Sequence, residues 1–148
     1  MPTPIAWTVR TALLYLLLSA ALGVWYQFEL WHPVFGADRY LIVIHVHLAL
    51  MGGVVQMIMG VALWMFPLVA PIERRLPFRP ALAWIMYALF NGGLLGCFAA
   101  EWAFRHGGGE VYGALTVLTG LLQLGAMGTF VYHLWRLRPS RRSVAGRS

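Results

Sequence analysis

Four long apolar stretches limit what this sequence can fold into. They run over roughly Thr11–Trp31, Tyr40–Phe66, Ala81–Phe104 and Val111–Trp135. A bilayer core of about 30 Å needs about 20 consecutive apolar residues in a helix, and each stretch meets that length. Of the 148 residues, 60% are hydrophobic and only 11% are charged, too few charges for the surface of a soluble domain. The sequence therefore predicts an all-α membrane protein.

The connections between these stretches are short and contain Pro or Gly. Short connections favour antiparallel neighbours, so we expect an up-down bundle of four transmembrane helices. The length allows a single membrane domain, residues 1–148, in which 136–148 form a basic cytoplasmic tail. Arg10 before the first apolar run is also a feature of secretory signals, but this run extends into the WYQFELW segment. We interpret it as an uncleaved span.

The arginines predict the orientation in the membrane. The net charge of +6 comes from 11 arginines, with no lysine in the chain. All but two of the arginines precede the first span, fill the second connection or follow the last span; the exceptions are Arg39 and Arg105. Under the positive-inside rule, both termini and the central connection are cytoplasmic in a multi-pass protein of the cell inner (cytoplasmic) membrane. The arginines form no basic face, so we expect membrane lipid as a partner and not nucleic acid.

His45 and His47, in the outer half of the second span, are the main functional candidates. Ionisable groups inside a membrane are costly and usually functional. Helical residues two apart diverge by about 200° around the axis, so the two imidazoles face opposite flanks and do not readily chelate one ion together. A lone metal ion needs three or four converging ligands, and we do not expect copper. Heme needs only one or two axial imidazoles within apolar walls, so heme b is the favoured cofactor.

Two glycines, Gly52 and Gly53, follow the histidine pair within two turns. A porphyrin face could rest on a helix side that carries no side chains, so we assign both glycines to the heme site. A second axial ligand could come from His32 after the first span or from His106 after the third. It could also come from the pair of another subunit, since a symmetric homo-oligomer would bring two copies to one axis. One or two hemes per subunit are possible.

A longer pattern surrounds the pair. His45-Val46-His47 is followed by Gly52, by Gly60 and then by the aromatic–Pro ending Trp64-Met65-Phe66-Pro67. In these residues the chain resembles the tenth transmembrane helix of subunit I of the heme-copper oxidase superfamily, and in size it looks like short stand-alone relatives of the cbb3-type subunit I. The resemblance implies that His45 binds a high-spin heme iron and His47 a low-spin heme iron.

The chain departs from that family at the copper site. The family uses three histidines on other helices, two of them adjacent, and this sequence has no His-His pair. We therefore do not expect a complete oxygen reductase, although a role as an oxidoreductase component stays open. The resemblance implies a b-type heme protein in electron transfer or diatomic gas binding, with a respiratory electron donor as a possible partner.

Two other functions stay open. One is a heme-free accessory or assembly subunit of a respiratory oxidase, and the other is a transporter or sensor of heme or metal. In the accessory subunit, the paired histidines need only make interhelical hydrogen bonds, which are worth about 0.6–2 kcal/mol. In the transporter or sensor, they would bind heme or metal transiently. Interhelical hydrogen bonds are also expected for Gln56, Asn91 and Gln123, which lie near the middle of their spans.

Overall fold

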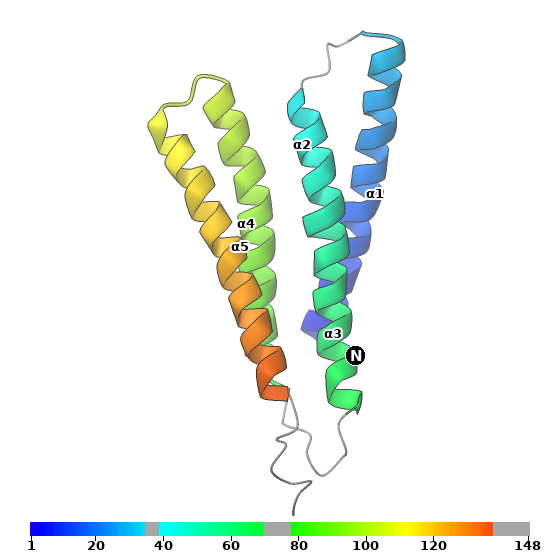
Figure 1. Ribbon diagram of the computed structural model, residues 1–148, viewed down its shortest axis with the longest axis vertical. Coiled ribbons are helices and arrows are strands. Elements are labelled where there is room, and N and C mark those ends of the chain that lie inside the picture. The colour runs from blue at the N-terminus through cyan, green and yellow to red at the C-terminus, as the bar shows by residue number, and fades with distance from the viewer. Residues whose placement is uncertain (35–38, 70–77, 138–148) are drawn as a thin grey trace, which may run out of the picture.

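The computed structural model describes residues 1–34, 39–69 and 78–137, and these residues are almost entirely helical (Figure 1). The helices are α1 (Thr3–Trp31), α2 (Arg39–His47), η1 (Leu48–Val55), α3 (Gln56–Val69), α4 (Pro80–Arg105) and α5 (Glu110–Leu137). The segment η1 is a π-helix that joins α2 to α3, so these three form one long helix.

Four helices are long and apolar enough to cross a membrane, as predicted: Thr3–Trp31, Tyr40–Phe66, Pro80–Arg105 and Glu110–Trp135. The first helix begins at Thr3, although its apolar run begins only at Thr11. Proline is favoured in the first turn of a helix, and Pro4 occupies that turn. Arg10 is tolerated within the helix because a long side chain near a membrane end can extend its charge toward water.

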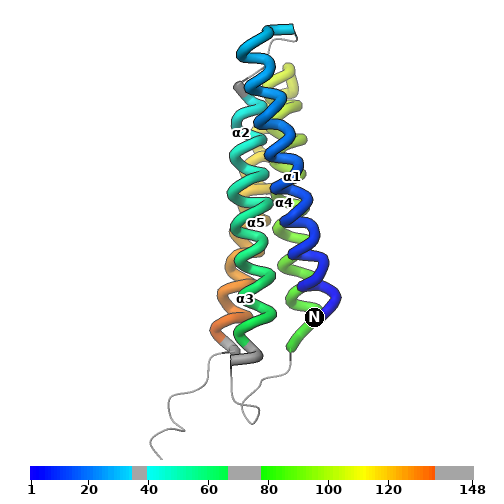
Figure 2. Tube along the Cα trace, turned by 90° about the vertical axis from the view of Figure 1, so that its right-hand side faces the viewer, coloured from blue at the N-terminus to red at the C-terminus, as the bar shows by residue number. Residues whose placement is uncertain are grey.

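The helices form two antiparallel hairpins. In one, α1 packs along α2, η1 and α3; in the other, α4 packs along α5. The hairpins meet through contacts of α1 with α4 and of α3 with α5, and they approach most closely at the end that holds the N-terminus (Figure 1). Figure 2 shows all four long helices running along one axis. The start of α1, the end of α3, the start of α4 and the end of α5 share one end of the molecule.

Two apolar clusters hold the hairpins together. The larger lies in the half of the molecule near the N-terminus and consists of Ile5, Met59, Leu63, Met86, Phe90 and Ala126. The smaller consists of Tyr15, Leu48 and Leu94. Only 11% to 33% of the most apolar window of each helix is buried inside the protein. The large apolar side chains on the remaining surface would be costly in water, which agrees with lipid as the solvent.

Side-chain hydrogen bonds connect α1 to α4 inside the apolar region. The Tyr15 hydroxyl donates to Oδ1 of Asn91 at 2.9 Å, and the hydroxyls of Thr11 and Tyr87 are 2.9 Å apart. The interhelical bond predicted for Asn91 is therefore confirmed.

Gln56 connects α3 to α1. Its Nε2 donates to the carbonyl oxygen of Thr8 at 3.1 Å, as predicted for an amide at mid-span. Its Oε1 is buried and, within the described part of the chain, is the one buried side-chain N or O atom without a hydrogen-bond partner. Gln123 of α5 packs against Gly93, where a Cβ atom would lie 2.8 Å from the glutamine Cγ.

Candidate functional site

His45 is held by the first helix. Its Nδ1 lies 2.7 Å from the carbonyl oxygen of Ser19 and 3.1 Å from the serine Oγ. The serine Oγ in turn donates to the carbonyl oxygen of His45 at 2.9 Å. One turn along α1, Gly23 gives the imidazole its space, since a Cβ atom there would lie 2.9 Å from Cε1 of His45. The ring is therefore fixed in position by two small residues of α1.

These contacts determine the tautomer of neutral His45. The only hydroxyl proton of Ser19 is used in the bond to the His45 carbonyl oxygen. A carbonyl oxygen can only accept, so Nδ1 must donate its proton to the Ser19 carbonyl. Nε2 then carries a lone pair. A histidine that ligates a metal usually has this arrangement, with its other ring nitrogen donating to a carbonyl or carboxylate.

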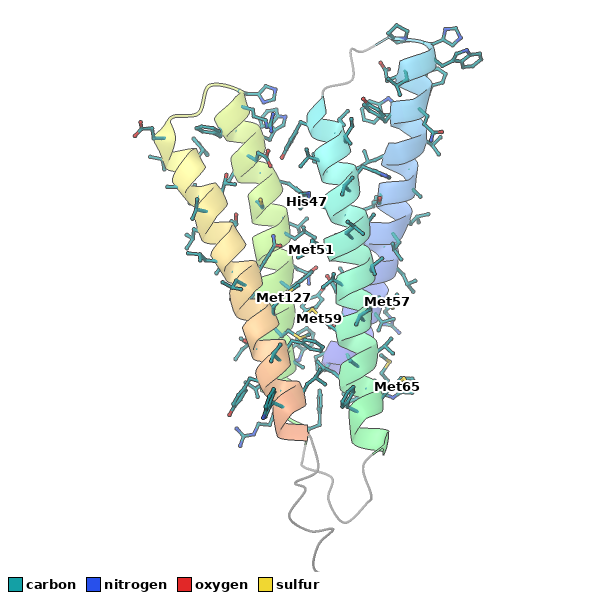
Figure 3. The ribbon with its side chains drawn as sticks, viewed as in Figure 1. His47, Met51, Met57, Met59, Met65 and Met127 are labelled. Atoms are coloured by element: carbon teal, nitrogen blue, oxygen red, sulfur yellow. The ribbon has the colours of Figure 1, made fainter. Side chains whose placement is uncertain are left out.

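His47 has the same tautomer but a different neighbour. Its Nδ1 lies 2.9 Å from the carbonyl oxygen of Val43, one turn earlier in the same helix. Its ring meets the ring of Phe98 edge to face, with the centroids 6.4 Å apart. Figure 3 shows His47 pointing from α2 toward α4. The side chain is exposed, so its Nε2 lone pair is accessible at the seam between α2 and α4.

The pair thus occupies opposite flanks of one helix. His45 contacts α1, while His47 faces α4. Both residues belong to α2, where regular helical spacing separates their side chains by about 200°. The π-helical segment begins directly after them. Wide turns of this kind are frequent at functional sites.

The glycine surface expected to receive a porphyrin is covered in this structure. Gly52 is buried, and a Cβ atom there would lie 2.7 Å from Cδ2 of Tyr15 and 3.0 Å from Cδ2 of Leu94. Gly53 is also buried, beneath Leu16, whose Cδ2 would lie 2.4 Å from such an atom. Both glycines therefore serve close packing of η1 against α1 and α4, and a macrocycle could lie on them only if these side chains moved.

The structure does not bring the two loop histidines to the pair. His32 ends α1 and packs on Trp31, with ring centroids 4.3 Å apart. It lies nine residues beyond Gly23, which is about 13 Å along a helix axis. His106 ends α4 with its ring stacked on Trp102 at 4.4 Å, and it lies about 12 Å along the axis from Phe98.

A small cavity adjoins His45 between α1 and α2. It has a volume of about 160 Å³ and is lined by Gly23, Tyr26, Gln27, Ile42 and His45. Neither this cavity nor the Ser19 contact was predicted from the sequence. One pattern could have pointed to the contact: Ser19 and Gly23 are small residues four apart, a spacing typical of close helix packing in membranes.

Tyr40 connects the two hairpins near His47. Its hydroxyl donates to the carbonyl oxygen of Phe98 at 2.6 Å, and its ring lies under the guanidinium of Arg105 at 5.2 Å. Arg105 also pairs with Glu101 at 2.8 Å. These contacts hold the start of α2 against α4.

Across residues 1–34, 39–69 and 78–137, no three His, Cys, Asp or Glu side chains are grouped so that they could hold a metal ion. The arrangement therefore offers single imidazole ligands on separate flanks. No family model, curated protein or solved structure matches the chain.

Proposed function

We propose that the protein is a b-type heme-binding protein of the inner membrane, related to subunit I of the heme-copper oxidases. The observation that carries the proposal is the state of His47: its Nδ1 proton is held by the Val43 carbonyl, and its Nε2 lone pair is accessible. An imidazole fixed in this way is ready to bind iron axially. Heme bound there would supply one-electron redox chemistry or a site for a diatomic gas.

The residues around His47 fit a macrocycle in part. Phe98 provides an aromatic wall beside the imidazole. On the other flank, the cavity beside His45 is smaller than the roughly 300–1,000 Å³ of typical cofactor sites. His47 is therefore the better candidate for the axial ligand, and the second heme that the resemblance assigns to His45 has less support.

A second axial ligand would come from another copy of the chain. His32 and His106 lie more than about 10 Å along the helix axes from the level of the pair. The exposed position of His47 suits a homo-oligomer in which two seams face each other. Iron with two imidazoles would serve electron transfer, whereas iron with a single imidazole would bind a gas.

The orientation is part of the proposal. The start of α1, the end of α3, the start of α4 and the end of α5 share one end of the molecule. In the sequence, the arginines concentrate before the first span, between the second and third spans and after the last span. The positive-inside rule assigns that end to the cytoplasm. Reporter fusions at each terminus and in the connection after α4 test this assignment, and a cytoplasmic signal from the last would overturn it.

The absorption spectrum of protein purified after expression with ample heme tests the cofactor. We expect a Soret band in the parent protein and its loss in His47→Phe. His45→Phe is the matched control, because it makes the same substitution on the opposite flank, and it should keep its heme. A colourless parent protein, or a His47→Phe variant with full heme content, would refute the assignment.

A second candidate is a heme-free accessory or assembly subunit of a respiratory oxidase. It is favoured by the packing of Tyr15, Leu16 and Leu94 over the two glycines, which leaves that helix face without room for a flat ligand. Under this alternative the parent protein and both histidine variants would be equally colourless.

A further inference from the structure

The cavity beside His45 has the size of a single six-membered ring. Its volume is about 160 Å³, and an engineered cavity of about 150 Å³ in another protein takes up benzene. Gln27 and Ile42 on its rim are exposed, so the cavity opens on the protein surface between α1 and α2. In a membrane that surface meets lipid, and a ligand would arrive from the bilayer.

The lining is mostly apolar and includes three polar residues, Tyr26, Gln27 and His45. Nε2 of neutral His45 carries a lone pair, because Nδ1 gives its proton to the Ser19 carbonyl. Within the described part of the chain, Nε2 has no hydrogen-bond partner. Tyr26 and Gln27 also line the cavity, and the hydroxyl of a tyrosine and the amide of a glutamine can each donate or accept a hydrogen bond. A ring that donates a hydroxyl to Nε2 of His45 and carries a second oxygen for Tyr26 or Gln27 would match this lining.

We propose that this cavity binds the head group of a lipid-soluble hydroquinone. Such a molecule has one six-membered ring, two hydroxyl oxygens on opposite sides of it, and an apolar tail that stays in the bilayer. The oxidised quinone fits less well, because both of its oxygens only accept hydrogen bonds and Nε2 of His45 would face a second acceptor. Binding rests on the cavity and on His45 and does not require heme at His47.

Titration calorimetry under anaerobic conditions tests the proposal, using purified heme-free protein in lipid nanodiscs and a hydroquinone with a ten-carbon tail. Three ligands with the same tail are compared: the hydroquinone, the quinone, and the hydroquinone dimethyl ether. We expect saturable binding of the hydroquinone, with about tenfold weaker binding of the other two, the effect of one lost hydrogen bond left without compensation.

The histidine variants locate the binding. His45→Phe should weaken hydroquinone binding about tenfold, whereas His47→Phe should leave it unchanged; circular dichroism and size-exclusion chromatography check that both fold. In protein with ¹⁵N-labelled histidine, the hydroquinone should move the Nε2 resonance of His45 and not that of His47. Equal binding of all three ligands, or of His45→Phe and the parent, would overturn the proposal, as would a lack of saturable binding.

The outcomes separate this inference from the heme proposal. Loss of heme in His47→Phe with unchanged hydroquinone binding supports both. A colourless parent protein that still binds the hydroquinone refutes only the heme proposal. A halved heme content in His45→Phe would mean that a heme occupies this flank, and it would refute the hydroquinone site alone.

Discussion

Replacing Gly52 with alanine tests whether this glycine serves helix packing or a porphyrin face. The added methyl group would lie 2.7 Å from Cδ2 and 2.9 Å from Cγ of the Tyr15 ring, and 3.0 Å from Cδ2 of Leu94. The ring cannot move away freely, because its hydroxyl donates to Asn91 at 2.9 Å and the side chain is buried.

The magnitude follows from three effects. Overpacking a filled core costs about 1–3 kcal/mol. Displacing Tyr15 would also weaken its bond to Asn91, and interhelical bonds in membranes are worth about 0.6 to 1.7 kcal/mol. Alanine offsets up to about 1 kcal/mol of this through its higher helix propensity. We therefore expect Gly52→Ala to lower the free energy of unfolding by about 1–3 kcal/mol.

The assay is the free energy of unfolding of heme-free protein in bicelles, measured by steric trapping. Gly92→Ala is the matched control, since Gly92 is an exposed glycine of α4 and a Cβ atom there would meet nothing within 4 Å. It should be neutral or stabilising by up to about 1 kcal/mol. If Gly52→Ala were as stable as the parent without heme but lost its heme, the packing argument would be wrong and the porphyrin would lie on this glycine.

Two further substitutions test the polar contacts of α1. Gln56→Leu should raise the free energy of unfolding by about 1 kcal/mol, because removing a buried unpaired oxygen gains more than the lost bond to Thr8 is worth. A clear loss of stability in the same assay would mean that Oε1 of Gln56 has a partner. Asn91→Leu should lower it by about 1–2 kcal/mol by leaving the Tyr15 hydroxyl unpaired. A double-mutant cycle with Tyr15→Phe should recover most of that loss, and full additivity would contradict the observed bond.

Much of the fold could be predicted from the sequence because the bilayer imposes a length on every span. The ends of the second span were predicted at Tyr40 and Phe66, as the structure has them. The start of the first helix was missed by eight residues, since hydropathy locates the apolar region and not the helix, which continues beyond the apolar run as far as Thr3. An interhelical hydrogen bond was predicted for Asn91, but its partner Tyr15 was not. Sequence spacing within one helix does not determine which helix lies opposite.

For the candidate site, the sequence was sufficient for the directions of the two histidines but not for the role of the glycines after them. The opposite directions of His45 and His47 depend only on their spacing within one helix, so the sequence was sufficient for that inference. The role of Gly52 and Gly53 depends on what covers them. A glycine next to a histidine pair is compatible both with a flat ligand and with a close helix, and nothing within the stretch distinguishes the two.

The sequence by itself determined that the chain forms four helices long and apolar enough to cross a membrane, because hydrophobic length and helical periodicity are properties of single segments. Only the tertiary structure decided that Ser19 fixes the tautomer of His45, that Gly23 makes room for its ring, and that a cavity of one ring's size lies beside it. These features join atoms of α1 to atoms of α2, and the contact between two helices depends on how their surfaces fit, which no single segment specifies.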